Sequence, residues 1–456
     1  MNGTSLLTTS SRIEQLRPRV FRLLRSTVTK NATSLYSIQF ASYVLPLITV
    51  PYLVRVLKPE RFGTVAFGQG LIAYFMALVE YGFGLSATRR ISAARENHEL
   101  VSRVASNIVA ARVLLCAGSF SLLICLIYFV PRLHEASTLL LVLYGSVIGM
   151  AIFPSYLFQG LERMSPIAVI NLSVRIVAIL AMFVVVRREE DYLAYAALIS
   201  AQSIVAAVVG VWAAFRMFQL HAVWPTWSGI GNSLKEGWIT FLSISAITLY
   251  TSGNAFILGM LTNDVVVGYY SAAEKIVRAA VAVLGPISQA AYPRFAKMAV
   301  ESKEMALRWA RRMLLLMGGV GFLITAAIFA CSGLIVHLVL GARFQASGPV
   351  MRILALLPLL VAISNVLGIQ ILFPFRQDRV VLVSVTTGGL VNVALAFLLA
   401  PVFQARGMAV SAVVAEFLVT ATQIYYIVKM GLNPLNPMPD GQAMAQEGPS
   451  MGGLEI

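Results

Sequence analysis

Charged residues are scarce in this sequence. Only 12% of its 456 residues are Asp, Glu, Lys or Arg, whereas 58% are hydrophobic and the mean hydropathy is +0.80. A soluble domain carries about 25% charged and about 45–50% apolar residues. No soluble core of this length could hide so much apolar surface, so lipid must be the solvent for much of it. The composition therefore predicts an integral membrane protein.

Residues that bind metals or carry out catalysis are also few. The three cysteines, Cys116, Cys125 and Cys331, lie in apolar stretches without a CxxC pair, and we interpret them as small buried hydrophobic residues. The four histidines form no HExxH motif. The chain also lacks the GxxxxGK[ST] loop of ATPases and the GxSxG of hydrolases. We therefore expect no metal, no cofactor and no enzymatic activity.

The hydrophobic residues gather in runs that could cross a membrane, for which about 20 mostly apolar residues are needed. Twelve such runs predict an all-α protein with about twelve transmembrane helices. They cover about 33–55, 62–87, 105–130, 137–158, 165–186, 193–215, 237–260, 266–292, 312–339, 348–374, 380–401 and 407–429.

The two ends of the chain differ from these runs. Residues 1–32 carry six Lys and Arg but no signal-peptide core, so the first span is predicted to be an uncleaved anchor. Residues 433–456 are rich in Pro and Gly, which predicts a disordered tail. If the spans alternate in direction, the segments on the same side of the membrane as the N-terminus hold 22 Lys and Arg, and those on the opposite side hold 8. The positive-inside rule then places both termini in the cytoplasm, and the net charge does not indicate a nucleic-acid partner.

The two halves of the chain resemble each other weakly. An offset of 205 residues aligns Gly63 with Gly268, Gln69 with Glu274, Leu71 with Ile276 and Arg89 with Arg294. Two six-helix bundles, 33–220 and 221–432, would then share one orientation and be related by an axis along the membrane normal. Such bundles enclose a central cavity that opens to alternate sides.

Ionisable residues inside the spans are the candidate functional residues, because each costs at least about 2.5–3.5 kcal/mol in lipid and normally faces a cavity or a partner. The cations are Arg112, Arg175, Lys275 and Arg278, and the acids are Glu80, Glu274 and Glu416. Their net positive sum favours an anionic passenger. For Arg112, snorkelling to the interface is the alternative. Glu80 and Glu416 could be proton or cation sites, or could form interhelical hydrogen bonds.

The span at 266–292 is the richest in charge, since Glu274, Lys275 and Arg278 lie along one helix face. Two interpretations stay open. In the first, Glu274 and Arg278 neutralise each other while Lys275 bonds to another helix. In the second, all three line a basic wall of an aqueous cavity.

Several short strings occur together in one family of membrane proteins. They are LPLITVPY at 45–52, RVL at 55–57, FG at 62–63, YGF at 81–83, SATR at 86–89, FQGLERM at 158–164, VGYYSAAEK at 267–275, YPR at 292–294 and GIQ at 368–370. The chain thereby resembles the polysaccharide repeat-unit flippases, of the O-antigen type, in the multidrug/oligosaccharidyl-lipid/polysaccharide exporter superfamily. One departure is Lys58, where that family often has Gly.

The resemblance implies two six-helix bundles around a basic cavity in a bacterial inner membrane. The implied passenger is an undecaprenyl-diphosphate-linked oligosaccharide, moved to the periplasmic leaflet for O-antigen, capsule or exopolysaccharide assembly. Arg175, Lys275 and Arg278 would pair with the diphosphate, helped by Arg112, and Arg89 and Arg90 would gather it at the inner mouth. Other expected partners are membrane lipid, a polysaccharide polymerase and a chain-length regulator.

Coupling to H⁺ or Na⁺ would involve Glu80, Glu274 or Glu416. The alternative function is a cation- or proton-coupled multidrug exporter of the same superfamily, although such a protein would favour unpaired carboxylates in its cavity. A glycan polymerase or ligase is disfavoured, because no predicted loop exceeds about 25 residues.

Overall fold

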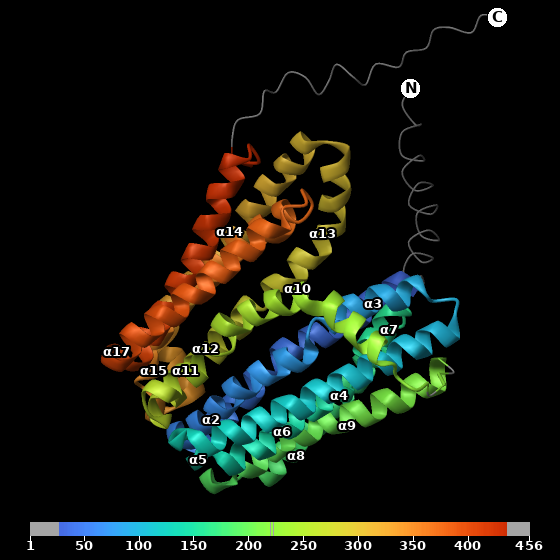
Figure 1. Cartoon of the computed structure of the whole chain (residues 1–456). Coiled ribbons are helices and arrows are strands. Elements are labelled where there is room, and N and C mark those ends of the chain that lie inside the picture. Colours follow the sequence, from blue (N-terminus) through green and yellow to red (C-terminus); the bar gives the residue numbers. More distant parts are fainter. Residues whose placement is uncertain (1–26, 219, 222, 436–456) are drawn as a thin grey trace, which may run out of the picture.

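Helices form the whole framework of the part of the chain that the structure describes. The structure, a computed structural model, describes residues 27–218, 220–221 and 223–435 (Figure 1). The N lobe comprises α2 (Thr27–Glu80), α3 (Phe83–Ala93), α4 (His98–Phe129), α5 (Pro131–Glu135), α6 (Ser137–Ile152), α7 (Ser155–Gly160), α8 (Ser165–Val185), η1 (Glu189–Asp191) and α9 (Tyr192–Phe218). Most of the predicted segments 1–32 and 433–456 lies outside the described residues.

The second half of the chain begins with α10 (Trp227–Thr251). The C lobe then comprises α11 (Asn254–Leu261), α12 (Asp264–Val281), α13 (Leu284–Glu301), α14 (Lys303–Ile335), η2 (Val336–Leu340), η3 (Ala342–Phe344), α15 (Ser347–Leu354), α16 (Leu357–Asn365), η4 (Val366–Leu372) and α17 (Asp378–Lys429). In lipid the backbone must satisfy its own hydrogen bonds, which explains why apolar sequence of this kind is helical.

Eight helical runs among the described residues are long and apolar enough to cross a membrane. Two of them, Ile48–Ala93 and Asp378–Lys429, extend over two predicted spans each. Helix α12 is not among the eight, because it carries four charged residues in 18. The prediction of an all-α integral membrane protein is confirmed, and twelve crossings are compatible with these helices.

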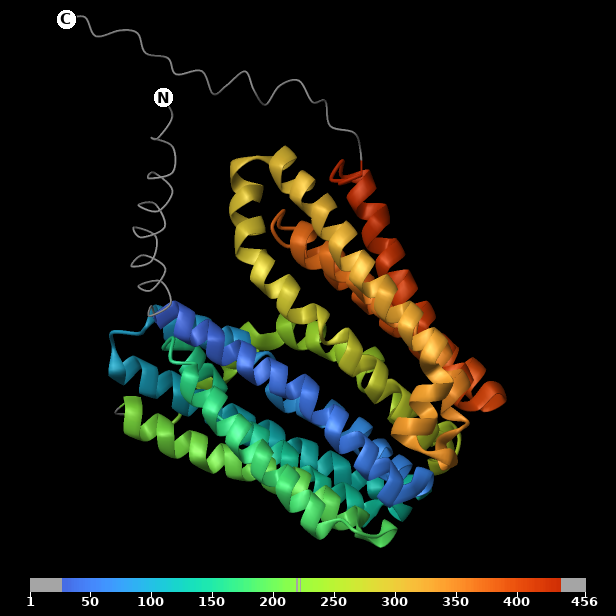
Figure 2. The same ribbon diagram turned by 180° about the vertical axis from the view of Figure 1, so that it is seen from behind.

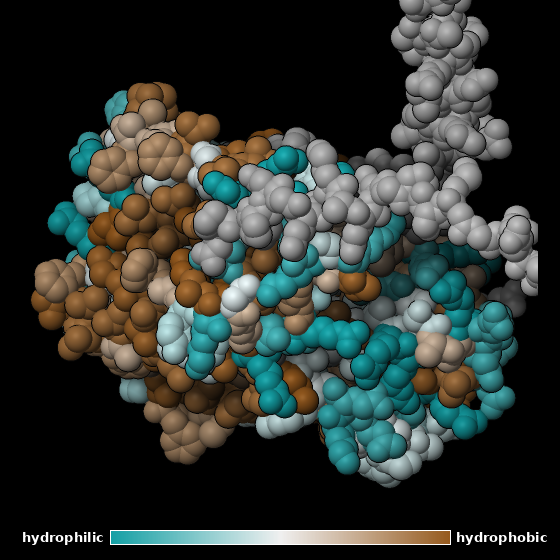
Figure 3. Space-filling view, turned by 90° about the horizontal axis from the view of Figure 1, so that it is seen from above, coloured by the Kyte–Doolittle hydropathy of each residue, from teal (hydrophilic) through white to brown (hydrophobic). Residues whose placement is uncertain are grey.

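Apolar side chains cover the outer surfaces of the helices. On α8, Val177, Leu180 and Val184 are all exposed, as expected of a face that contacts lipid. Cys125 and Cys331 are exposed on such faces too, so the prediction that they are buried is wrong. Figure 3 shows a broad hydrophobic surface and, on the side where α3 and α7 lie in Figure 1, a hydrophilic one. That hydrophilic surface suits contact with water.

The prediction of unbroken helices over 62–87, 137–158, 237–260, 266–292 and 348–374 is wrong, since each of these runs contains a break between two helices. Helix α2 ends at Glu80, and Tyr81 and Gly82 adopt φ angles of 46° and 77° before α3 begins. Two residues likewise separate α10 from α11, and two separate α12 from α13. Hydropathy averages over many residues, so it does not detect a break this short.

The two lobes meet at one end of the molecule and diverge toward the other (Figures 1 and 2). We call the end formed by α5, α11 and α15 the closed end, and the end formed by α3 and the α13–α14 turn the splayed end. Helices α2 and α12 form the most extensive contact between the lobes. Helix α10 packs on α3 and α4 and also on α17, so it bridges the lobes. The division of the chain at 220/221 stays a prediction.

Lys58 sits at a sharp turn inside α2, with φ 58° and ψ 169°. This conformation belongs almost entirely to glycine and costs other residues about 1–3 kcal/mol. We expect Lys58→Gly to raise the free energy of unfolding by about 1 kcal/mol, measured by thermal unfolding in detergent. Lys58→Ala is the control, because it keeps the strained φ and loses the 2.7 Å ion pair with Glu189. A glycine variant no more stable than the alanine variant would contradict the prediction.

Candidate functional site

Helix α12 brings three charged side chains to the contact between the lobes. Arg278 donates from Nε and Nη2 to Glu274 Oε1, each at 2.9 Å. The Lys275 Nζ donates to Gln69 Oε1 of α2 at 3.2 Å. These contacts match the first of the two open interpretations, a self-neutralising pair beside a lysine bonded to another helix. They also place Lys275 where the two lobes touch.

Arg278 and Lys275 both have surroundings in which they could bind an anion. The Arg278 side chain is 44% exposed, although its Nη2 also donates to the Thr251 carbonyl of α10. Lys275 is half-buried, and its Nζ lies 5.1 Å from the centre of the Phe62 ring. Within the described residues, Lys275 forms no ion pair with a carboxylate. Its hydrogen-bond acceptor is therefore a neutral amide, and the nearby Glu274 attracts its charge without forming an ion pair with it.

Gln69 contacts Lys275 and a residue that lies beside Arg175. Besides accepting from Lys275, the Gln69 side chain hydrogen bonds with Tyr195 of α9. Tyr195 and Arg175 of α8 line one cavity of about 110 Å³ inside the N lobe. Arg175 therefore faces the same cavity as Tyr195, the partner of Gln69. Neither Gln69 nor Tyr195 was predicted as a site residue, because an uncharged side chain in an apolar span does not stand out in the sequence.

A buried chain of hydrogen bonds holds Glu274 from the other side. Asn392 Nδ2 of α17 donates to Asn254 Oδ1 at 2.7 Å, and Asn254 Nδ2 donates to the Tyr270 hydroxyl at 3.1 Å. The Tyr270 hydroxyl donates to Glu274 Oε1 at 3.3 Å. Asn254, Tyr270 and Asn392 are at most 1% exposed. Buried polar groups need such partners, and this chain fixes the carboxylate that in turn orients Arg278.

Arg112 and Glu80 lie together inside the N lobe, away from α12. Arg112 is 1% exposed, and its Nη2 lies 2.6 Å from Glu80 Oε2. Its Nη1 donates to the Phe153 carbonyl at 3.1 Å. Glu80 Oε1 accepts the Gly84 N–H at 2.9 Å, which anchors the start of α3. Arg112 therefore does not snorkel, and the pair holds the break between α2 and α3.

The two arginines predicted at the inner mouth lie on α3 at the splayed end. Arg89 is exposed. The Arg90 Nη1 donates to Ser233 Oγ at 3.1 Å and lies 3.7 Å from Glu236 Oε2, both on α10. Arg89 is therefore the better placed of the two to meet a ligand from solution.

Glu416 lines a cavity of about 400 Å³ in the C lobe, together with Arg278. Its side chain is 8% exposed, and its Oε1 accepts a hydrogen bond from Ser364 Oγ at 2.7 Å. This is the interhelical hydrogen bond that was the structural alternative for Glu416. The carboxylate also lines the cavity that Arg278, a predicted binding residue, shares. Among the described residues, no group of three or more His, Cys, Asp or Glu could hold a metal ion.

Helices α2 and α12 approach closely at two glycines, and these glycines are the pair that the predicted repeat aligns. A Cβ on Gly63 would overlap the Asp264 carbonyl oxygen, and a Cβ on Gly268 would overlap the Pro59 carbonyl oxygen. Pro59 and Asp264 are also 205 residues apart. Each helix thus receives the other at an equivalent position, as a two-fold relation between halves requires. We call Pro59, Gly63, Asp264 and Gly268 the glycine seam.

The chain matches one family model and two known sequences over most or much of its length. The family model described as "Polysaccharide biosynthesis protein" matches residues 28–299. A protein of Escherichia coli (strain K12) named "Putative O-antigen transporter" is 28% identical over 398 residues, covering 87% of this chain and 96% of that protein. A protein of the same name from Shigella dysenteriae is 27% identical, covering 86% of this chain and 97% of its own length.

Two solved structures share the fold at low sequence identity. The lipid II flippase MurJ, in an inward closed conformation, superposes with a TM-score of 0.70 at 13% identity, covering 87% of this chain and 89% of MurJ. A multidrug resistance MATE family transporter of the MOP superfamily, in an inward-facing conformation, gives 0.67 at 15% identity, covering 88% and 99%. At such identities the likeness establishes the architecture alone.

Proposed function

The chain belongs to the polysaccharide biosynthesis protein family, and from that premise we propose that it is a flippase for undecaprenyl-diphosphate-linked oligosaccharide repeat units. It moves them from the cytoplasmic to the periplasmic leaflet of a bacterial inner membrane, for O-antigen, capsule or exopolysaccharide assembly. The relatives named as O-antigen transporters support this passenger class. The observation that carries the proposal is Lys275, a cation that forms no ion pair among the described residues, at the contact between the two lobes.

A diphosphate sugar cannot cross hydrocarbon unaided, because its charges and hydroxyls would lose water with nothing in exchange. In this proposal Lys275 and Arg278 replace that water for the diphosphate. Arg175, in the cavity lined by Tyr195, adds positive charge on the N-lobe side. Arg278 suits phosphate through its planar fork of donors. The polyprenyl tail remains in lipid. Arg112 is left out of this site, because it is buried against Glu80.

We assign the splayed end to the cytoplasm, in keeping with the distribution of Lys and Arg. The passenger enters there past Arg89, which is exposed on α3. Rocking of the lobes then closes the splayed end and opens the closed end to the periplasm.

Two sources could drive the movement. A passenger of charge about −2 gains roughly 4–5 kcal/mol from a membrane potential of about 100 mV, inside negative, if it crosses without compensating charge. Coupling to H⁺ or Na⁺ is the other source. Of the three predicted carboxylates, Glu80 and Glu274 are paired with arginine. Glu416 accepts from Ser364 and reaches the cavity that it shares with Arg278, which makes it the favoured coupling residue.

Deleting the gene in its host should abolish one surface polysaccharide and trap its undecaprenyl-linked repeat unit on the cytoplasmic side. Gel analysis of surface glycan and mass spectrometry of the lipid-linked pool would measure both, and a plasmid copy should restore them. Unchanged glycans together with a changed sensitivity to cationic drugs would refute the proposal and favour a multidrug exporter.

A further inference from the structure

We propose that Arg132, Thr64 and Asp264 form a latch that locks the closed end, and that its release accompanies transport. The proposal rests on the alternating access of the proposed function. We call these three residues the outer latch. None of them was among the predicted site residues, and none contacts Lys275 or Arg278.

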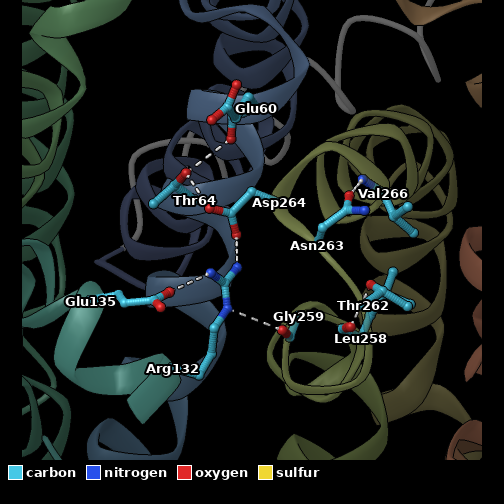
Figure 4. A network of polar contacts seen from close by, with 10 residues as sticks. All are labelled: Glu60, Thr64, Arg132, Glu135, Leu258, Gly259, Thr262, Asn263, Asp264 and Val266. Atoms are coloured by element: carbon cyan, nitrogen blue, oxygen red, sulfur yellow. Dashed lines mark hydrogen bonds and ion pairs between the residues drawn. The ribbon is translucent and has the colours of Figure 1, made fainter.

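The outer latch joins the lobes through both oxygens of one carboxylate (Figure 4). The Arg132 Nη2, on α5 of the N lobe, donates to Asp264 Oδ1 of α12. The Thr64 Oγ1, on α2, donates to Asp264 Oδ2 at 2.8 Å. Arg132 Nε also donates to the Gly259 carbonyl of α11 at 3.4 Å. One guanidinium of the N lobe thus contacts two helices of the C lobe.

Local structure holds both partners in place before they meet. Asp264 is the first residue of α12, where a negative charge is favoured by the helix dipole, and the Asn263 side chain caps the same turn by accepting the Val266 N–H. On the other side, Arg132 Nη1 lies 3.2 Å from Glu135 Oε2, and its guanidinium lies 5.3 Å from the centre of the Phe67 ring. The latch therefore closes between two preset groups.

The chemistry of this contact suits opening as well as closing. The Arg132 and Asp264 side chains are 29% and 17% exposed, so water can take over their hydrogen bonds when the lobes part. A cavity of about 260 Å³ beside them is lined by Arg61, Thr64, Glu135 and Tyr192, among others. Charged groups with access to water separate at far less cost than a buried ion pair.

Helix α12 links the latch to the proposed binding site. Asp264, Gly268, Ser271 and Lys275 are spaced by four, three and four residues, which places them along one face of the helix. At about 1.5 Å per residue, Asp264 lies roughly 16 Å from Lys275 along the axis. A displacement of α12 when an anion binds at Lys275 would therefore act directly on the carboxylate of the latch.

The test is the accessibility of a buried reporter beside the glycine seam. Ser271 is 1% exposed and its hydroxyl has no hydrogen-bond partner among the described residues, so Ser271→Cys is a mild change. In a background without Cys116, Cys125 and Cys331, a membrane-impermeant maleimide is applied from the periplasmic side. We expect Arg132→Ala and Asp264→Asn each to raise the labelling rate about tenfold. This factor corresponds to the loss of one charge-assisted hydrogen bond that holds the closed end shut. Arg132→Lys, which keeps the charge but not the fork, should fall between them and the parent.

Arg95→Ala is the matched control. Arg95 pairs with Glu162 at 2.6 Å within the N lobe at the splayed end, so its loss should leave labelling unchanged. Labelling of Arg132→Ala that equals the parent, or a rise of the same size in Arg95→Ala, would overturn the latch. The readout needs no glycan, so a working latch in a protein without glycan transport would reject the proposed function and retain the latch.

Discussion

Replacing Lys275 with alanine is expected to slow the appearance of the passenger glycan at the cell surface by about 10- to 100-fold. A hydrogen bond to a charged group contributes about 1.5–3 kcal/mol, and each 1.4 kcal/mol corresponds to about a tenfold change. Within the described residues, the Lys275 Nζ lies at the contact between the lobes and donates to the neutral side chain of Gln69, with no carboxylate in ion-pair distance. The measurement is a pulse of labelled sugar precursor, followed by quantification of surface and lipid-linked glycan.

Two variants make the result specific to the charge at this position. Lys275→Arg keeps the cation and should retain most transport. Lys297→Ala removes an exposed lysine on α13, paired with Glu301 at 3.6 Å, and should transport normally. All variants should insert in equal amounts, as measured on extracted protein. Normal export by the Lys275→Ala variant would contradict the role of Lys275 in binding the passenger.

Replacing Arg112 with alanine is expected to cause the largest loss of stability, about 3 kcal/mol in the free energy of unfolding. The change leaves Glu80 Oε2 and the Phe153 carbonyl without the donor that Arg112 supplies, although Glu80 Oε1 keeps the Gly84 N–H. Breaking a buried ion pair costs about 3–5 kcal/mol, and the lower value applies because the Glu80 side chain is 27% exposed. Thermal unfolding in detergent and the yield of folded protein would measure the effect.

Neutralising both partners tests the cause of that loss. In the double variant Glu80→Gln with Arg112→Met, no charge is left unpaired, so it should be more stable than Arg112→Ala alone. Arg103→Ala breaks an exposed pair with Glu99 on α4 and should change stability little. If the Arg112→Ala and Arg103→Ala variants unfold at the same temperature, the buried pair does not hold α3 in place.

Sequence predicted the framework well because hydropathy reports where lipid is the solvent. The runs at 165–186 and 193–215 correspond closely to α8 and α9. The break at Tyr81 and Gly82 was missed, because it depends on two backbone angles and on a hydrogen bond from Gly84 to Glu80. Such local geometry leaves almost no trace in an average over 20 residues.

Of the candidate site, the sequence predicted the charged residues inside spans and did not predict their uncharged partners. Lys275 and Arg278 were found because cations are rare in apolar spans. Gln69 was missed as a partner because an uncharged side chain in a span gives no such signal. Asp264 and Arg132 were missed because they lie at the ends of spans, where charge is ordinary. Their significance follows only from contacts between residues 132 positions apart.

The glycine seam has a consequence for recombining the two halves of this chain with those of other proteins. A chimera joins one half to a foreign half, and its interface must fit without prior adjustment. Because Gly63 admits the backbone of the C lobe and Gly268 admits that of the N lobe, both donors must supply glycine at the matching place. A donor with any side chain there would keep the helices apart, however well its binding residues matched. Interchange of halves is therefore limited by the absence of a side chain at these two positions more than by the identity of the cations at the proposed binding site.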